Sequence, residues 1–186
     1  MRIIAGANRG LKLVDIGGGD IEARLRPTSD RVRESLFNVL NGGAFGRPIE
    51  NANVLDLFAG TGALGLEALS RGARFASFVD NGRVSQKLLR ENIRLARRQD
   101  QTRVLKCEAS SLPEAQEPCS LVFLDPPYGQ DLGVAALSSA AANGWLAEDA
   151  LIVWEESGPV LAPNGFQRID TRKYGGTHIT FLRYGA

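Results

Sequence analysis

The sequence predicts an α/β fold: a doubly wound, mostly parallel sheet that ends in an antiparallel hairpin, with a small N-terminal β-arm and helix before it. Strand-like and helix-like segments alternate from about residue 51, as in parallel sheets with helices on both faces. A glycine-rich turn joins the first such strand to the first such helix, and the tail holds two strand-like runs around a glycine turn. We therefore expect an arm over residues 1–50 and an α/β domain over residues 51–186.

The arm is predicted from short β-prone pieces that turn residues separate. These pieces are residues 2–5, 11–16 and 21–25, and their spacing is typical of a small hairpin or meander. A helix should follow, beginning near Pro27 and Thr28 and ending at the Asn-Gly-Gly of residues 41–43. Apolar residues at helical spacing form its buried face: Val32, Leu36, Val39 and Leu40.

The larger domain is predicted from changes in hydrophobic period along the chain. Its strands should cover residues 53–58, 74–80, 102–107, 120–124 and 150–155. Its helices should cover residues 62–71, 83–98 and 131–142. Residues 165–172 and 176–184 resemble two further strands, so we expect the sheet to finish with an antiparallel hairpin.

Composition indicates a globular protein that needs no disulfide or structural metal to hold its fold. Hydrophobic residues make up 44% of the 186 residues, enough to bury a core unaided. Cys107 and Cys119 lack metal-type spacing, and we expect two buried thiols in a reducing cytosol. The single histidine, His178, excludes multi-histidine metal sites, so we expect no metal. The chain shows no signal-peptide core and no apolar run of membrane length, so we expect a cytoplasmic protein.

A glycine-rich loop predicts a nucleoside-binding site. Gly60, Gly62 and Gly65 have the spacing G-x-G-x-x-G directly after the strand at 53–58 and open the next helix, as in Rossmann-like folds. Asp80 ends the following strand about 20 residues further on, where a carboxylate can accept bonds from both hydroxyls of a ribose. The alternative is a tight strand–helix turn that binds no ligand.

The carboxylate of Asp56 favours S-adenosylmethionine over a dinucleotide. Asp56 lies within the strand, close to the loop, where it disfavours a pyrophosphate and favours a sulfonium and an ammonium group; alternatively, it caps its own loop. Glu108 follows the third strand and is a candidate for the adenine amino group, unless it is simply exposed to solvent. The full expected cofactor set is Asp56, Phe58, Ala59, Gly60, Thr61, Gly62, Asp80, Asn81, Glu108 and Ala109.

The strand at 120–124 ends abruptly in Asp125-Pro126-Pro127-Tyr128. This strand should lie beside the one at 53–58, where strand order reverses and ligands bind. Prolines have no N–H, so the loop offers only acceptors: its carbonyls and the Asp125 carboxylate. Such acceptors suit the exocyclic amino group of a nucleobase, and Tyr128 can stack on a flipped base. We expect these four residues to be catalytic, by aligning nitrogen, methyl group and sulfur; the alternative is a proline-rich turn without chemistry.

Five stretches together resemble the bacterial 16S ribosomal RNA guanine-N2 methyltransferases, nearly from end to end. They are R2-IIAGANRGLKL-13, R26-PTSDRVRESLFNVL-40, V54-LDLFAGTGALGLEALSRGA-73, D125-PPY-128 and K173-YGGT-177. The resemblance implies a class I fold, S-adenosylmethionine as methyl donor, and one guanine of the small subunit as substrate, within an assembling particle. The tetrapeptide is shared with adenine-N6 and glutamine-N5 methyltransferases, so the arm is what favours guanine. Where Glu108 stands the family often has Asp, which leaves the adenine contact less secure than the ribose contact.

Two basic surfaces are candidates for RNA binding. The arm offers Arg9, Lys12, Arg24, Arg26, Arg31 and Arg33 as expected RNA contacts; the alternative is a β-cap that shields the sheet. The helix at 83–98 carries a stripe that can track phosphates or simply be solvated: Arg83, Lys87, Arg90, Arg94 and Arg97.

Three other functions stay open from the residues alone. Adenine-N6 methylation of DNA or RNA uses the same chemistry, but the chain has no sizeable DNA-reading domain. A NAD-dependent oxidoreductase also uses a glycine loop. A non-catalytic RNA-binding factor of ribosome assembly would need the basic arm but not Asp125.

Overall fold

The computed structural model describes residues 1–15, 30–129 and 132–185, and a seven-stranded sheet is its centre. Strand order is β3-β2-β1-β4-β5-β7-β6. The strands are β1 (Asn53–Leu57), β2 (Phe75–Val79), β3 (Thr102–Leu105), β4 (Cys119–Leu124), β5 (Leu146–Glu156), β6 (Phe166–Tyr174) and β7 (Thr177–Tyr184). The helices are α1 (Asp30–Asn41), α2 (Ala63–Ser70), α3 (Arg83–Ala96) and α4 (Leu132–Ala142), with a 3₁₀ turn η2 (Gln99–Gln101).

The predicted topology is confirmed. β1 pairs in parallel with β2 on one side and with β4 on the other, so strand order reverses between β1 and β4. β7 runs antiparallel between β5 and β6. β5 begins four residues earlier than expected, because Leu146 already pairs with Cys119 before the ladder shifts register. The carboxyl ends of β1, β2 and β4 therefore lie at one edge of the sheet, called here the carboxyl edge.

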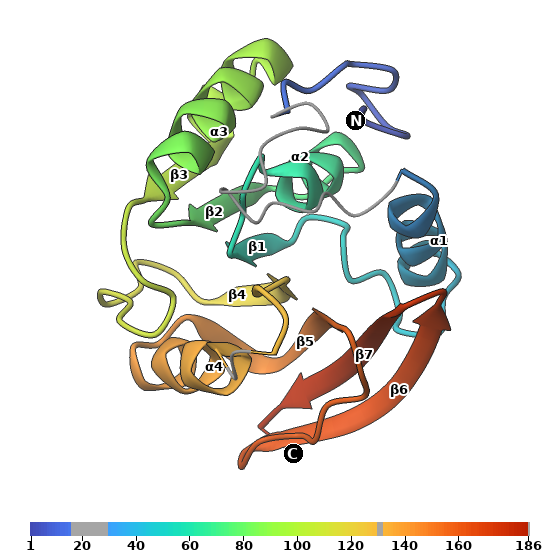
Figure 1. The fold of residues 1–186 in the computed structure, drawn as a ribbon, viewed down its shortest axis with the longest axis vertical. Helices are drawn as coiled ribbons and strands as arrows, with labels where there is room; N and C mark the ends of the chain where they lie inside the picture. The colour runs from blue at the N-terminus through green and yellow to red at the C-terminus, as the bar shows by residue number, and fades with distance from the viewer. Residues whose placement is uncertain (16–29, 130–131, 186) are drawn as a thin grey trace.

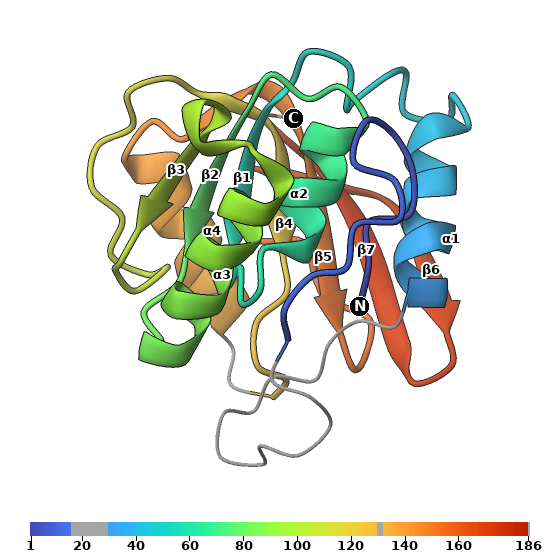
Figure 2. The same ribbon diagram turned by 90° about the horizontal axis from the view of Figure 1, so that it is seen from above.

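Helices cover both faces of the sheet (Figures 1 and 2). α1, α2 and α3 share one apolar core with the face that carries Val54, Phe123 and Phe181. α4 covers the opposite face, where Leu137 packs in a second core with Leu55 and Trp154. Both cysteines are free thiols. None of the helices in the described part of the chain combines the length and the apolar character that a membrane span requires.

Residues 1–15 of the arm form a short hairpin that packs against α2: the Ile3 N–H donates to the Leu11 carbonyl (2.9 Å) and the Leu13 N–H to the Met1 carbonyl (3.1 Å). Over residues 1–15 its β structure is a single bridge between Arg2 and Lys12; the predicted piece at 21–25 and the helix start at Pro27 and Thr28 lie outside the described residues. The pairing stays short because helix α2 takes the next backbone donors of the first piece. The buried carboxylate of Glu67 accepts from the N–H groups of Ile4 (2.7 Å) and Ala5 (3.1 Å). The arm is thus bound to the same helix that the glycine loop opens.

We expect Gly6 to be required for this docking. Gly6 has φ +81°, and a Cβ there would lie 1.8 Å from the backbone oxygen of Ser70. Gly10 is a matched control, with φ +84° and nothing within 4 Å of the point that a Cβ would occupy. Gly10→Ala should cost about 1 kcal/mol through backbone strain alone, and Gly6→Ala roughly 2–4 kcal/mol because the arm must shift. Urea unfolding of both variants measures this, and equal losses would show that Ser70 imposes no constraint.

Candidate functional site

The glycine loop, residues 58–65, folds tightly at the end of β1. Phe58 has φ +60° although it is not glycine, and Gly60 and Gly62 have φ +54° and +78°. A Cβ on Gly62 would lie 2.4 Å from Leu89 Cδ1 of α3, so this side chain would have to move, and the positive φ of Gly62 would strain any other residue at this position. The Ala59 N–H donates to the Val79 carbonyl (3.0 Å), which ties the loop to the end of β2.

Asp80 follows β2 and organises two loops. Its Oδ2 accepts from the Gly60 N–H (2.8 Å) and its Oδ1 accepts from the Gly82 N–H (2.8 Å). The side chain lies partly exposed between the glycine loop and the start of α3. Each oxygen keeps further acceptor capacity, so the carboxylate can also accept ligand hydroxyls.

Asp56 lies beneath the glycine loop, within β1. It is 2% exposed, and its Oδ2 accepts from the Gly65 N–H at the start of α2 (2.9 Å). Burial raises its pKa to about 8, the nearby charge of Asp80 adds to this, and the bond from Gly65 acts in the opposite direction. Asp56 therefore caps its own loop, as the alternative to a cofactor-binding role proposed. A cation beside it would stabilise its ionised, carboxylate form.

Residues at the ends of β2 and β3 also meet. Asn81 Nδ2 donates to Glu108 Oε1 (2.5 Å), which brings two members of the expected cofactor set into contact. Ala109 beside them is buried, at 4% exposure. Glu108 thus lies beside Asn81 on the exposed rim of the carboxyl edge.

The loop of residues 125–128, called here the acceptor loop, begins next to the glycine loop. Leu124 and Leu57 are register partners, and the Asp125 N–H lies 3.5 Å from the Leu57 carbonyl oxygen. Pro126 is buried, while Tyr128 is 37% exposed. Since neither proline has an N–H, the backbone between Asp125 and Tyr128 presents carbonyl oxygens only.

Two residues outside the expected site set contact Tyr128. Its hydroxyl donates to Glu155 Oε1 (3.1 Å) and lies 3.3 Å from Thr177 Oγ1. Burial raises the pKa of Tyr128 to about 12, the carboxylates of Glu155 and Asp125 add to this, and the bond to Thr177 lowers it. A charged residue at the end of the apolar run 150–155 was the available signal for Glu155.

The donor groups of the glycine loop fit S-adenosylmethionine better than a pyrophosphate. The N–H groups of Gly60 and Gly65 are bonded to carboxylates, and that of Gly62 is bonded to the Ala59 carbonyl (2.7 Å). These are the groups that would cradle phosphates in a dinucleotide site. A loop flanked by Asp56 and Asp80 instead suits a nucleoside that carries positive charge. Groups of three or more potential metal ligands are absent from the described part of the chain.

The basic residues that were expected to bind RNA differ in their exposure to solvent. Arg9, Lys12 and Arg31 are exposed, and Arg24 and Arg26 lie outside the described residues. Arg33 is a correction to the expected RNA contacts: it is 0% exposed, its Nη2 donates to the Arg2 carbonyl and to Asp30 Oδ1 (2.8 Å), and burial lowers its pKa. The whole predicted stripe on α3 is exposed, and Arg94 pairs with Glu91 (2.6 Å).

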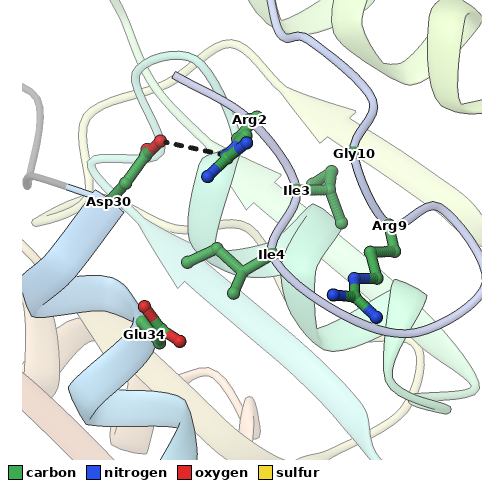
Figure 3. Close-up of a pocket in the computed structure, with 7 residues that line it drawn as sticks. All are labelled: Arg2, Ile3, Ile4, Arg9, Gly10, Asp30 and Glu34. Atoms are coloured by element: carbon green, nitrogen blue, oxygen red, sulfur yellow. Dashed lines mark ion pairs between the residues drawn. The ribbon is translucent and has the colours of Figure 1, made fainter.

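A pocket of about 180 Å³ lies within the arm, between residues 2–10 and α1 (Figure 3). Arg2, Arg9, Asp30 and Glu34 supply charges of both signs to its wall. Arg2 and Asp30 form an ion pair across it (3.8 Å). Of the residues expected to bind a ligand, only Arg9 lines this pocket, so it is distinct from the carboxyl edge.

Known proteins resemble this chain over nearly its whole length. A family model described as Conserved hypothetical protein 95 matches residues 1–183. Ribosomal RNA small subunit methyltransferase D of Escherichia coli K12 is 44% identical over 158 residues, 83% of this chain and 74% of that protein. The protein of the same name from Haemophilus influenzae is 34% identical over 94% of this chain and 89% of its own length. The solved structure of Escherichia coli yhhF, described as a methyltransferase, has a TM-score of 0.82, with 36% identity over 100% of this chain and 98% of that one.

We expect the raised pKa of Asp56 to make stability depend on pH. Between about pH 4 and pH 8 the folded chain holds a proton on Asp56 that the unfolded chain has lost, so this contribution to stability falls as pH rises. Asp56→Asn removes the titration, and its stability relative to wild type should rise from pH 5 to pH 8 by up to about 1.4 kcal/mol per pH unit. Urea unfolding at pH 5, 6, 7 and 8 measures this. Asp100→Asn, at an exposed position, is the control, and a pH-independent difference for Asp56→Asn would contradict the assignment.

Proposed function

We propose a function for this chain, which belongs to the Conserved hypothetical protein 95 family: it transfers a methyl group from S-adenosylmethionine to the exocyclic N2 amino group of a guanine in 16S ribosomal RNA. The observation that carries this proposal is the juxtaposition of two loops. The glycine loop, with its two carboxylates, and the acceptor loop begin side by side after the paired residues Leu57 and Leu124. Its relatives' names, which specify ribosomal RNA of the small subunit, support the substrate class.

The donor side of the proposal rests on residues 56–62, 80–81 and 108–109. S-adenosylmethionine supplies a methyl group on a positively charged sulfur. Asp80 accepts from the ribose hydroxyls, and Glu108 with the Ala109 backbone meets the adenine edge. Asp56 holds Gly65 in place (2.9 Å), and the positive charge of the bound cofactor displaces its proton, so that the resulting carboxylate supports the ammonium side. Phe58, Ala59, Gly60, Thr61 and Gly62 form the floor of the same site.

The acceptor side of the proposal is the target amino group. The lone pair of an exocyclic amine is delocalised into its ring, which makes the nitrogen a poor nucleophile. The Asp125 carboxylate and the Pro126 carbonyl accept hydrogen bonds from the two N–H groups of this amine. These bonds localise the nitrogen lone pair toward the methyl group. Tyr128 offers a ring face for the flipped base, and Pro127 keeps the backbone free of competing donors. Alignment of the reacting atoms then supplies most of the rate. As the nitrogen–methyl bond forms, the methyl–sulfur bond breaks and its electron pair stays on sulfur as a neutral thioether. The methylated nitrogen then releases one proton, through the Asp125 carboxylate, to water.

The choice of guanine rests on the family and on the basic arm. Arg9, Lys12 and Arg31 are exposed and can pair with RNA phosphates. The α3 stripe extends this basic surface: it begins three residues after Asp80 and, at 1.5 Å per residue, runs for about 20 Å. We propose that the arm and this stripe together bind the RNA around the target base. We further propose that the small subunit is still assembling when it is methylated.

We expect methyl incorporation into small subunits that lack the modification. Purified protein and labelled S-adenosylmethionine should yield N2-methylguanosine after nuclease digestion and mass analysis. Asp125→Ala should lower kcat by at least about 100-fold, as the loss of a group that acts on the reacting atoms does. Asp149→Asn, at an exposed position, is the matched control. A methylated adenosine as product, or full activity of Asp125→Ala, would refute the corresponding part of the proposal.

Salt dependence should distinguish the two basic surfaces from ordinary solvated charge. Each lost phosphate contact should reduce the slope of log Kd against log salt by about 0.7 to 0.9. We expect two triple variants, Arg9→Gln/Lys12→Gln/Arg31→Gln and Arg83→Gln/Lys87→Gln/Arg90→Gln, to lower the slope by roughly 2 each. The control is Arg168→Gln/Lys173→Gln, at exposed positions of the outer strand β6. A slope equal to that of wild type in either triple variant would remove that surface from the proposed RNA path.

A further inference from the structure

We propose that Glu155 and Thr177 are positioning residues that hold the ring of Tyr128 in place for the target base. This inference rests on the proposed function, because it assigns Tyr128 a role in base binding. It adds two residues from the C-terminal part of the sheet to a site otherwise built from the glycine loop and the acceptor loop. Neither residue contacts the reacting atoms in this proposal; both act through Tyr128.

The contacts join three separate segments at a single hydroxyl group. Tyr128 comes from the acceptor loop, Glu155 from the end of β5 and Thr177 from the start of β7. The hydroxyl lies 3.1 Å from Glu155 Oε1 and 3.3 Å from Thr177 Oγ1. A tyrosine hydroxyl donates one hydrogen bond and can accept others. Donation to the carboxylate leaves Thr177 free to donate to the same oxygen, so both contacts can form together.

The buried position of the Glu155 carboxylate requires hydrogen-bond donors such as the Tyr128 hydroxyl. Glu155 is 6% exposed, at the end of a strand whose preceding residues are apolar and buried, and its register partner on β7 is Ile179. A buried carboxylate is costly unless hydrogen bonds satisfy it. A simple packing role would be filled better by an apolar residue, as at Val153 and Trp154. The carboxylate is therefore explained by the groups that it bonds, of which the Tyr128 hydroxyl is one.

Protonation supports the contact throughout the neutral range. Burial, followed by the charges of Glu155 and Asp125, raises the pKa of Tyr128 to about 12 against the lowering effect of Thr177. The phenol therefore stays neutral and keeps its proton for Glu155. An ionised phenol would have no proton to donate and would repel the carboxylate.

Anchoring the hydroxyl leaves the ring available at the surface. Tyr128 is 37% exposed even though its hydroxyl is bonded. The two prolines before it restrict the backbone, so one anchor at the far end of the ring limits the remaining freedom of the acceptor loop. A ring that is ordered in advance loses less side-chain entropy when a base stacks on it. The Gly175 turn, at φ +62°, brings Thr177 back beside the acceptor loop.

A double-mutant cycle tests the anchor. Tyr128→Phe keeps the ring and removes the hydroxyl, and Glu155→Ala removes its main acceptor. We expect each to lower kcat/KM for RNA by about 10-fold and the double variant to lower it by about 10-fold, not 100-fold, because both changes break one contact. Glu155→Gln should recover most of the activity. The dissociation constant for S-adenosylmethionine should stay within about twofold of wild type in all variants, since no cofactor residue changes. Independent, multiplicative losses would overturn the proposal.

A second measurement does not depend on methylation. The chain has three tyrosines, so ring-labelled ¹³C-tyrosine gives a small set of resonances, and Tyr128→Phe identifies the one from Tyr128. Glu155→Ala/Thr177→Val should shift and sharpen this resonance while that of Tyr184, at the far end of the β6–β7 hairpin, stays in place. Glu156→Gln is the matched control, because the Glu156 carboxylate accepts from the backbone and hydroxyl of Ser157 (2.7 and 3.0 Å). An unchanged Tyr128 resonance refutes the anchor, whereas absence of methylation with the expected shift refutes only the proposed function.

Discussion

The parallel pairing of β1 with β4 is the constraint on which the candidate active site depends. Leu57 and Leu124 are register partners, so the glycine loop and the acceptor loop leave the sheet at the same level. β2 pairs with the other side of β1 through Val79, which sets Asp80 at the same edge. Strand order reverses at this point, and loops that leave in opposite directions open the crevice in which α/β sheets bind ligands. Every proposed step of the reaction uses groups that this pairing brings together.

Buried polar side chains then attach the arm to the same site. Asn92 of α3 is fully buried; its Oδ1 accepts from the Val14 N–H (2.7 Å), and its Nδ2 donates to the carbonyls of Val14 and Thr61 (both 2.9 Å). One side chain thus contacts both the arm and the glycine loop. Glu67 binds the arm from α2 in the same manner (2.7 Å to Ile4). Because buried polar groups must be satisfied, the proposed RNA-binding arm and the proposed cofactor loop share structural supports.

Much of the site could be predicted because its residues follow strands. Asp80 and Asp125 each stand directly after an apolar run, and the carboxyl ends of parallel strands gather at one edge of the sheet. The prediction that Arg33 contacts RNA is wrong, because its charge suggests solvent whereas its guanidinium lies under the arm, bonded to the Arg2 carbonyl. The first two β pieces of the arm pair only briefly for a related reason: the N–H groups of Ile4 and Ala5 bond to α2, which lies more than 60 residues further along the chain.

Local sequence alone specifies the order of helices and strands, the glycine loop and the acceptor loop, because hydrophobic period, glycine and proline act over a few neighbouring residues. It also indicates the family through motifs at both ends of the chain. Long-range packing was needed to establish that Asp56 caps Gly65, that Arg33 is buried and that Glu155 and Thr177 meet Tyr128. The contacts of Tyr128 span 27 and 49 residues, and no local pattern specifies which distant side chains a folded sheet will bring together.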